Sequence, residues 1–255
     1  MTLFQAIALG IVQGLTEFLP ISSSAHLALA KWLMGISPGE HLLYFDLICH
    51  SGTLIALIFY LRYEIFSVLS SIHTMALFIL ALIPLAPAYF FLKPLIRAAS
   101  NPSYLGYFLL LTAFLLFIAV RKKEVIPQNR IKKRDVLCIG CMQTLALLPG
   151  ISRSGSTIAA ARLLGWEWKK AARFSFLLAV PAILGGQILE TAKWMGSHPE
   201  KTLSMNCYFA GFFTSLVVGL LSVRAIFWIY EKGNVRPFAW YCLAAGLLAI
   251  WMLHG

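Results

Sequence analysis

Apolar residues are gathered in six long segments of this chain, and polar side chains are sparse within them. The segments are residues 42–61, 74–92, 104–120, 171–190, 206–230 and 238–253. A helix that crosses the hydrocarbon core of a bilayer needs roughly 20 predominantly apolar residues. Because the segments are close to that length, the pattern predicts an all-α integral membrane protein with about six transmembrane helices.

Two further regions, residues 3–34 and 136–165, are apolar at both ends but interrupted in the middle by Pro, Gly, Ser and ionisable residues. Irregular backbone at membrane depth is tolerated only where protein or a water-filled cavity surrounds it, because lipid offers no hydrogen-bond partners. We therefore expect these regions to form two re-entrant helix-loop-helix hairpins, or broken spans, that line a polar cavity.

The two interrupted regions also resemble each other in sequence. Residues 13–35 align with residues 143–165 at a constant offset of 130, and eight of the 23 positions are identical. A composition this biased gives roughly two or three identities by chance. If each hairpin returns to its starting side, the three spans that follow it leave the second copy upside down relative to the first.

The sequence thus predicts an inverted-topology internal repeat within a single membrane domain, residues 1–255. The first repeat covers about 1–120, a basic loop covers 121–135, and the second repeat covers about 136–255. In such repeats the working site lies between the halves, so we expect the hairpins to meet near the membrane centre.

Composition and charge agree with this arrangement. Hydrophobic residues make up 60% of the chain and charged residues only 12%, which excludes a soluble enzyme or a water-exposed catalytic domain. The basic loop and the regions 62–73, 162–173 and 231–236 together hold 14 Lys and Arg side chains, against five on the opposite side. This asymmetry predicts that the basic loop is cytoplasmic, and it explains the net charge of +11 without a nucleic-acid partner.

The first interrupted region concentrates polar side chains within ten residues. They are Glu17, Ser22, Ser23, Ser24 and His26. A carboxylate in hydrocarbon costs about 2.5–3.5 kcal/mol, so Glu17 should face a cavity or a cation, with Gln13 on the same helical face. Pro20 ends one helix, and a serine can cap the next, which leaves free N–H groups at the break. Alternatively, the serines only cap a kink and His26 is a structural core residue.

The second interrupted region reads Pro149-Gly-Ile-Ser-Arg-Ser-Gly-Ser-Thr157. Glycines let backbone N–H groups approach an anion, the next helix offers its positive end, and Arg153 offers a planar fork for phosphate oxygens. The run therefore predicts a phosphate cradle, although it is not a P-loop. The expected phosphate-binding residues are Ser22, Ser24, Gly150, Ser152, Arg153, Ser154, Gly155, Ser156 and Thr157. Alternatively, Arg153 only forms a structural ion pair with Glu17 across the pseudo-two-fold axis. In both cases we expect Glu17 and His26 to lie within about 10 Å of Arg153.

These two motifs together resemble the undecaprenyl-diphosphate phosphatases, the bacitracin-resistance membrane proteins of bacteria. The resemblance also takes in residues 45–46, 52–53 and 173–181, so it covers essentially the whole chain. It implies an enzyme of the bacterial cytoplasmic (inner) membrane that removes the terminal phosphate of undecaprenyl diphosphate. The product is the monophosphate carrier used to export cell-wall precursors.

The resemblance further implies site residues and a cofactor. It assigns catalysis to Glu17, Ser23, His26 and Arg153, and a divalent cation, Mg²⁺ or Ca²⁺, to Glu17 with Gln13. Two departures bear on the metal: Gln13 leaves Glu17 the only carboxylate of the first motif, and Ala25 stands where the family commonly has Gly.

The residues leave several alternatives open. Ser23 can attack phosphorus with His26 as base, or His26 can attack directly and form a phosphohistidine. Asp46 is a further candidate for a catalytic role. Inverted repeats are also typical of transporters, so a carrier or flippase for an anionic prenyl-phosphate lipid is the competing function. The expected partners are the polyprenyl diphosphate substrate and the bilayer, and the oligomeric state stays open between monomer and homodimer.

Overall fold

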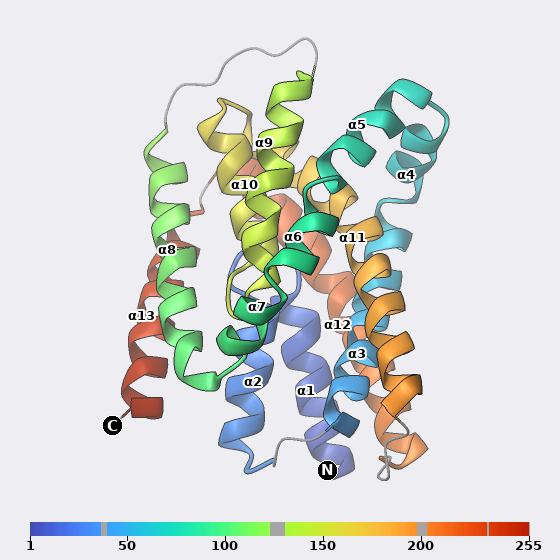
Figure 1. Ribbon diagram of the computed structural model, residues 1–255, viewed down its shortest axis with the longest axis vertical. Helices are drawn as coiled ribbons and strands as arrows, with labels where there is room; N and C mark the ends of the chain where they lie inside the picture. The colour runs from blue at the N-terminus through green and yellow to red at the C-terminus, as the bar shows by residue number, and fades with distance from the viewer. Residues whose placement is uncertain (37–39, 123–130, 198–202, 234, 255) are drawn as a thin grey trace.

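The computed structural model describes residues 1–36, 40–122, 131–197, 203–233 and 235–254, and within these ranges all regular structure is helical (Figure 1). The helices are α1 (Leu3–Thr16), α2 (Ser23–Leu33), α3 (Glu40–Tyr60), α4 (Arg62–Leu69), α5 (Ile72–Leu82), α6 (Leu85–Phe91), α7 (Lys93–Ala99), η1 (Pro102–Tyr104), α8 (Leu105–Arg121), α9 (Lys133–Gln143), η2 (Thr144–Leu147), α10 (Arg153–Leu163), α11 (Trp168–Ser197), α12 (Met205–Lys232) and α13 (Arg236–His254).

Six helical stretches are long and apolar enough to cross a membrane, which confirms the predicted all-α membrane fold. They are Leu42–Tyr60, Ile72–Phe91, Pro102–Arg121, Trp168–Lys193, Met205–Lys232 and Arg236–His254. The second stretch differs from the continuous span expected at 74–92, because it is divided into α5 and α6 at Pro84. Proline lacks the N–H that a continuous helix requires and clashes with the preceding turn. The region 62–73, expected as a connection, contains the short helix α4.

The two interrupted regions each form a pair of short helices joined by an irregular break: α1 with α2, and α9 with α10. The bounds of α2 and α10 differ by the same offset of 130 that relates the sequences. Ser22 caps α2 and Ser152 caps α10, each accepting a hydrogen bond from the backbone N–H three residues later. Both helices are followed by a glycine with positive φ, Gly35 and Gly165. The two regions therefore share the position and capping of their second helix, although the breaks themselves differ, since φ is +70° at Ser22 and −73° at Ser152.

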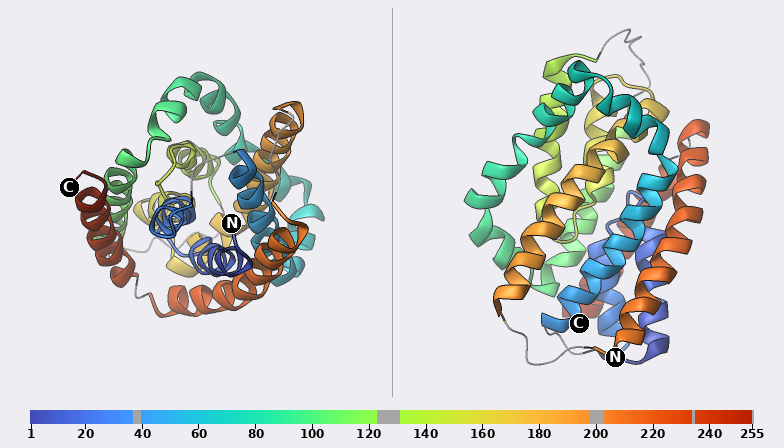
Figure 2. Two further views of the ribbon diagram at one scale, coloured as in Figure 1. Left: turned by 90° about the horizontal axis from the view of Figure 1, so that it is seen from below. Right: turned by 90° about the vertical axis from the view of Figure 1, so that its right-hand side faces the viewer.

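Each pair of short helices packs against spans from the other half of the chain (Figure 2). Helix α1 lies against α12, and α9 lies against α5. Equivalent glycines permit both approaches: a Cβ on Gly10 would lie 2.9 Å from the Gly211 carbonyl oxygen, and one on Gly140 would lie 2.3 Å from that of Ala81. This exchange of partners is what a pseudo-two-fold relation between the halves requires.

We expect Gly140→Ala to lower the thermal unfolding temperature in detergent by several degrees. The new methyl group meets backbone rather than a flexible side chain, and overpacking of this kind costs roughly 1–3 kcal/mol. Gly185→Ala is the matched control, because a Cβ at Gly185 meets nothing within 4 Å. Equal unfolding temperatures for the two variants would contradict the close α5–α9 contact.

The described residues of the cation-rich regions, among them Arg62, Arg162 and Lys169, lie in helix ends that gather at one end of the molecule, the top of Figure 1. Arg162 donates to the Lys122 carbonyl oxygen at 2.5 Å, and Lys169 pairs with Glu231 at 2.5 Å. These contacts join the ends of α8, α10 and α12 and the start of α11. The chain termini lie at the opposite end (Figure 1). The charge asymmetry in the sequence thus corresponds to two distinct ends of the fold, and we predict that the cation-rich end is cytoplasmic.

An aromatic cluster fixes the break between α1 and α2. Phe18 is fully buried, and its ring meets that of Phe176 of α11 edge to face at a centroid distance of 6.1 Å. Phe176 in turn contacts Phe227 of α12 at 5.2 Å. Because Phe18 directly follows Glu17, this packing anchors the backbone that carries the buried carboxylate.

Candidate active site

The two helix breaks meet in the interior of the protein, as the repeat predicted. The Gly150 N–H donates to Ser24 Oγ at 3.2 Å, and Ser154 Oγ donates to the Leu19 carbonyl oxygen at 3.2 Å. These two bonds run between breaks that lie about 130 residues apart in the sequence. The irregular backbone of each break is therefore partly satisfied by the other.

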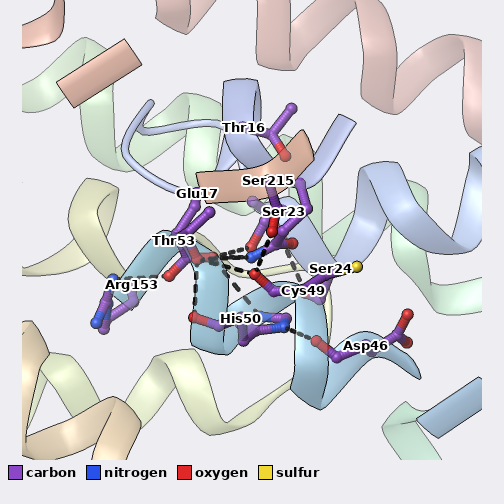
Figure 3. A network of polar contacts seen from close by, with 12 residues as sticks. Thr16, Glu17, Ser23, Ser24, Asp46, Cys49, His50, Thr53, Arg153 and Ser215 are labelled. Atoms are coloured by element: carbon purple, nitrogen blue, oxygen red, sulfur yellow. Dashed lines mark hydrogen bonds and ion pairs between the residues drawn. The ribbon is translucent and has the colours of Figure 1, made fainter. Parts of the chain in front are cut away.

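An ion pair between Glu17 and Arg153 lies where the breaks meet (Figure 3). Arg153 Nη2 lies 3.0 Å from Glu17 Oε1, and the two side chains are only 17% and 6% exposed. The expected proximity of these residues is confirmed. Arg153 Nη1 is buried with no hydrogen-bond partner among the described residues, so one arm of the guanidinium is left to bind another anion.

Three further side chains lie close to the second carboxylate oxygen of Glu17, Oε2 (Figure 3). Ser23 Oγ donates to Oε2 at 2.7 Å and Gln13 Nε2 donates at 2.9 Å, while His50 Nε2 lies 3.6 Å away. The other ring nitrogen of His50, Nδ1, lies 2.8 Å from the Asp46 carbonyl oxygen. That bond requires a proton on Nδ1, so in the neutral ring Nε2 carries the lone pair toward Glu17.

Ser23 is the first residue of α2, and the residue before it is strained. Ser22 has φ +70°, the only positive φ among the described non-glycine residues. A backbone conformation of this kind costs roughly 1–3 kcal/mol and is typical of functional sites. It turns the chain sharply from the break into α2, and Ser23 Oγ lies within hydrogen-bond distance of Glu17 as a result.

The structure places His26 away from the expected pairing with Ser23. Its Nδ1 lies 2.7 Å from the Ser22 carbonyl oxygen, and its Nε2 lies 2.7 Å from the Tyr241 hydroxyl. The ring stacks on Tyr241 of α13 at 5.6 Å. No hydrogen bond joins Ser23 and His26 in the described part of the chain, because the His26 ring is held against α13 and does not line the cavity.

A cavity of about 410 Å³ adjoins the ion pair. Both breaks, α3 and the second half of α11 form its walls, and Leu85 of α6 completes them. The breaks supply most of the polar groups, whereas α3 and α11 add apolar side chains such as Leu43 and Ile183 together with the polar His50 and Gln187. Asp46 also lines the cavity, where it pairs with Lys31 at 2.5 Å. The cavity thus has a polar end for an anion and an apolar wall.

The predicted phosphate-binding residues divide into two groups. Those that line the cavity are Ser22, Ser24, Ser152, Arg153 and Ser154; those that do not are Gly150, Gly155, Ser156 and Thr157. The Ser156 and Thr157 hydroxyls donate to carbonyl oxygens one turn earlier in α10, at 2.8 and 2.9 Å. They therefore satisfy their own helix instead of facing a ligand.

Three polar cavity residues escaped the sequence analysis, His50, Gln143 and Gln187. All three lie within apolar stretches, where a polar side chain is costly and commonly functional, and this signal was available in the sequence.

Glu17 is the carboxylate at the breaks that could hold a divalent cation, and both of its oxygens accept bonds from protein side chains in this structure. The described residues contain no group of three or more His, Cys, Asp or Glu side chains able to hold a metal ion. Gln13 is fully buried behind Glu17 and does not line the cavity. A cation here would therefore take most ligands from water and substrate phosphate, which suits Mg²⁺ better than Ca²⁺.

The fold and the cavity define the class: a helical, multi-pass membrane protein with a polar site between two broken helices. The sequence model described as "Bacitracin resistance protein BacA" matches residues 6–248, and the chain belongs to this family.

Several curated relatives are similar along their whole length. An undecaprenyl-diphosphatase of Protochlamydia amoebophila (strain UWE25) is 41% identical over 250 residues, covering 97% of each chain. One from Geobacter sulfurreducens is 40% identical over 262 residues, covering 96% of each. One from Caldicellulosiruptor bescii is 38% identical over 268 residues, covering 100% of this chain and 99% of the relative. The protein is accordingly a multi-pass protein of the bacterial inner membrane.

Proposed function

We propose that this protein hydrolyses undecaprenyl diphosphate to undecaprenyl phosphate and inorganic phosphate. The observation that carries the proposal is the Ser23–Glu17–Arg153 cluster beside the cavity: a hydroxyl bonded to a carboxylate, with a guanidinium that has one free arm. A protein that only carries an anion needs the cation but has no use for an activated hydroxyl. The apolar cavity wall suits the start of the prenyl chain.

The geometry supports Ser23 as the nucleophile and Glu17 as its base. Ser23 Oγ attacks the terminal phosphorus, its proton passes to Glu17 Oε2, and the bond to the bridging oxygen breaks. The electron pair leaves on the prenyl monophosphate, and Arg153 Nη1 neutralises charge on the terminal phosphate. Water then attacks the phosphoserine and gives up a proton, the bond between phosphorus and Ser23 Oγ breaks, and Glu17 returns its proton to Oγ, which regenerates the Ser23 hydroxyl and the Glu17 carboxylate. His50 Nε2 is placed to accept the proton that water gives up.

The other side chains around this cluster act by positioning. Gln13 Nε2 holds Glu17 Oε2, and Phe18 anchors the adjacent backbone. We assign His26 a positioning role, in which its contact with Tyr241 fixes α2 against α13. A divalent cation bound at Glu17 would add positive charge at the phosphates and help to orient them.

Phosphate release by purified protein tests the proposal. We expect detergent-solubilised protein to convert undecaprenyl diphosphate to the monophosphate with one phosphate released per lipid. EDTA should lower the rate at least about tenfold and Mg²⁺ should restore it, because the described residues offer no cluster of three metal ligands and a cation held by few protein ligands is readily removed by a chelator.

The controls separate the two parts of the proposal. If no phosphate is released in any condition while lipid is still transferred between the leaflets of vesicles, the protein is a flippase and the proposed hydrolysis is wrong. Full activity in EDTA would show that hydrolysis needs no divalent cation, and the proposed hydrolysis itself would stand.

A further inference from the structure

Gln143 is a buried amide with no hydrogen-bond partner among the described residues. It is the last residue of α9, is only 2% exposed and lines the cavity. Neither its Nε2 nor its Oε1 forms a hydrogen bond to any described residue. Buried amides are nearly always hydrogen-bonded, because leaving the group unpaired costs free energy. An unpaired amide that faces a cavity points to a ligand.

The internal repeat explains why this amide is free. Its equivalent in the first copy is Gln13, whose Nε2 donates to Glu17 Oε2 at 2.9 Å. Four residues after Gln143 the second copy has Leu147 instead of a carboxylate. The same amide therefore supports the reacting end in one half of the protein and has nothing to bind in the other.

The remaining groups of the cavity show which part of a ligand it can meet. Ser23 and Glu17 hold each other at the end where we place phosphorus attack, and Arg153 is bonded to Glu17 from the other side. The transferred phosphate must lie against Ser23. Gln143 belongs to a different element from these three residues, the end of α9, and is not bonded to any of them.

We propose that Gln143 binds the phosphate that stays on the lipid, by donating Nε2–H to one of its non-bridging oxygens. The inference rests on the proposed function for the identity of the lipid. Gln143 is then a specificity residue for the phosphate attached to the prenyl chain. Both the diphosphate substrate and the monophosphate product carry that phosphate, whereas free inorganic phosphate has no prenyl chain and does not occupy the position beside Gln143.

The test compares Gln143→Met with the matched variant Gln13→Met at the equivalent position of the other copy. Binding of undecaprenyl monophosphate to purified protein is measured directly, together with kcat and KM for the diphosphate. For Gln143→Met we expect monophosphate affinity to fall about tenfold or more, as for a lost hydrogen bond to a charged group. KM should rise in parallel, kcat should change less than about threefold, and inhibition by free phosphate should be unchanged.

Gln13→Met should behave in the opposite way, with lower kcat and unchanged monophosphate affinity, because it loosens Glu17. Unchanged affinity and KM in Gln143→Met would overturn the proposal, and so would a fall in kcat alone, which would place Gln143 at the transferred phosphate. If Gln143→Met fails to purify, Gln143→Glu keeps the shape of the side chain, and we expect it to bind the monophosphate at least about tenfold more weakly than wild type. Wild-type affinity in Gln143→Glu would contradict the proposal. Because monophosphate binding needs no turnover, it tests Gln143 even if hydrolysis is absent.

Discussion

Arg153→Ala should reduce phosphate release at least about a hundredfold. Among the described Lys and Arg residues, Arg153 alone is bonded to the buried carboxylate, and its free arm is placed to neutralise charge that develops on the transferred phosphate. Losing a charge-assisted contact that strengthens in the transition state costs roughly 3 kcal/mol or more. The measurement is phosphate release under saturating lipid by protein that still purifies as a monodisperse species.

Arg153→Lys is the informative companion variant. It keeps the charge but loses the planar fork that contacts Glu17 and an anion together, so we expect a rate between those of wild type and Arg153→Ala. Wild-type turnover in Arg153→Ala would show that the ion pair with Glu17 is purely structural.

Ser23→Ala should abolish hydrolysis while the protein still binds undecaprenyl monophosphate. The variant removes the hydroxyl that attacks phosphorus, but it leaves Arg153, Gln143 and the start of α10 in place. Brief reaction with labelled diphosphate followed by denaturation should trap an acid-stable phosphoserine in the wild-type protein. This measurement distinguishes the serine from a histidine nucleophile, since phosphohistidine is lost in acid.

His26→Ala provides the comparison for this result. If Ser23→Ala retains full hydrolysis and His26→Ala loses it, the serine nucleophile is wrong and attack by His26, or by water that His26 activates, takes its place. If neither variant affects hydrolysis, the chemistry does not lie at the α1–α2 break, and Asp46 is the next residue to test.

Much of the fold followed from the sequence because burial in a membrane imposes strong rules. Apolar length alone located the six spans, and the offset of 130 between the interrupted regions predicted that Glu17 and Arg153 meet. Proline shows the limit of this reasoning. Pro181 lies inside the continuous helix α11, whereas Pro84 separates α5 from α6, and the pattern at 74–92 did not reveal the difference.

The site was predicted less completely than the fold, because side-chain direction depends on tertiary neighbours. His26 lies close to Ser23 in sequence, yet its ring is engaged by Tyr241, 215 residues further along the chain. His50 lies in another helix, and only the folded chain brings its Nε2 to Glu17. Nor does a hydroxyl-rich run reveal which hydroxyls bond to their own helix, as Thr157 does.

The exchange of packing partners between the halves also sets the order in which the protein can be completed during synthesis. The α1–α2 hairpin leaves the ribosome first, but α12 and α13, which hold α1 and His26, leave last. Glu17 must wait for a counter-ion 136 residues downstream, and a carboxylate without one is costly within the bilayer. A chain truncated before α12 would retain Glu17, Ser23 and Arg153 and still lack an assembled site. Premature termination or slow insertion of the last two helices should therefore expose the nascent protein to quality-control proteolysis.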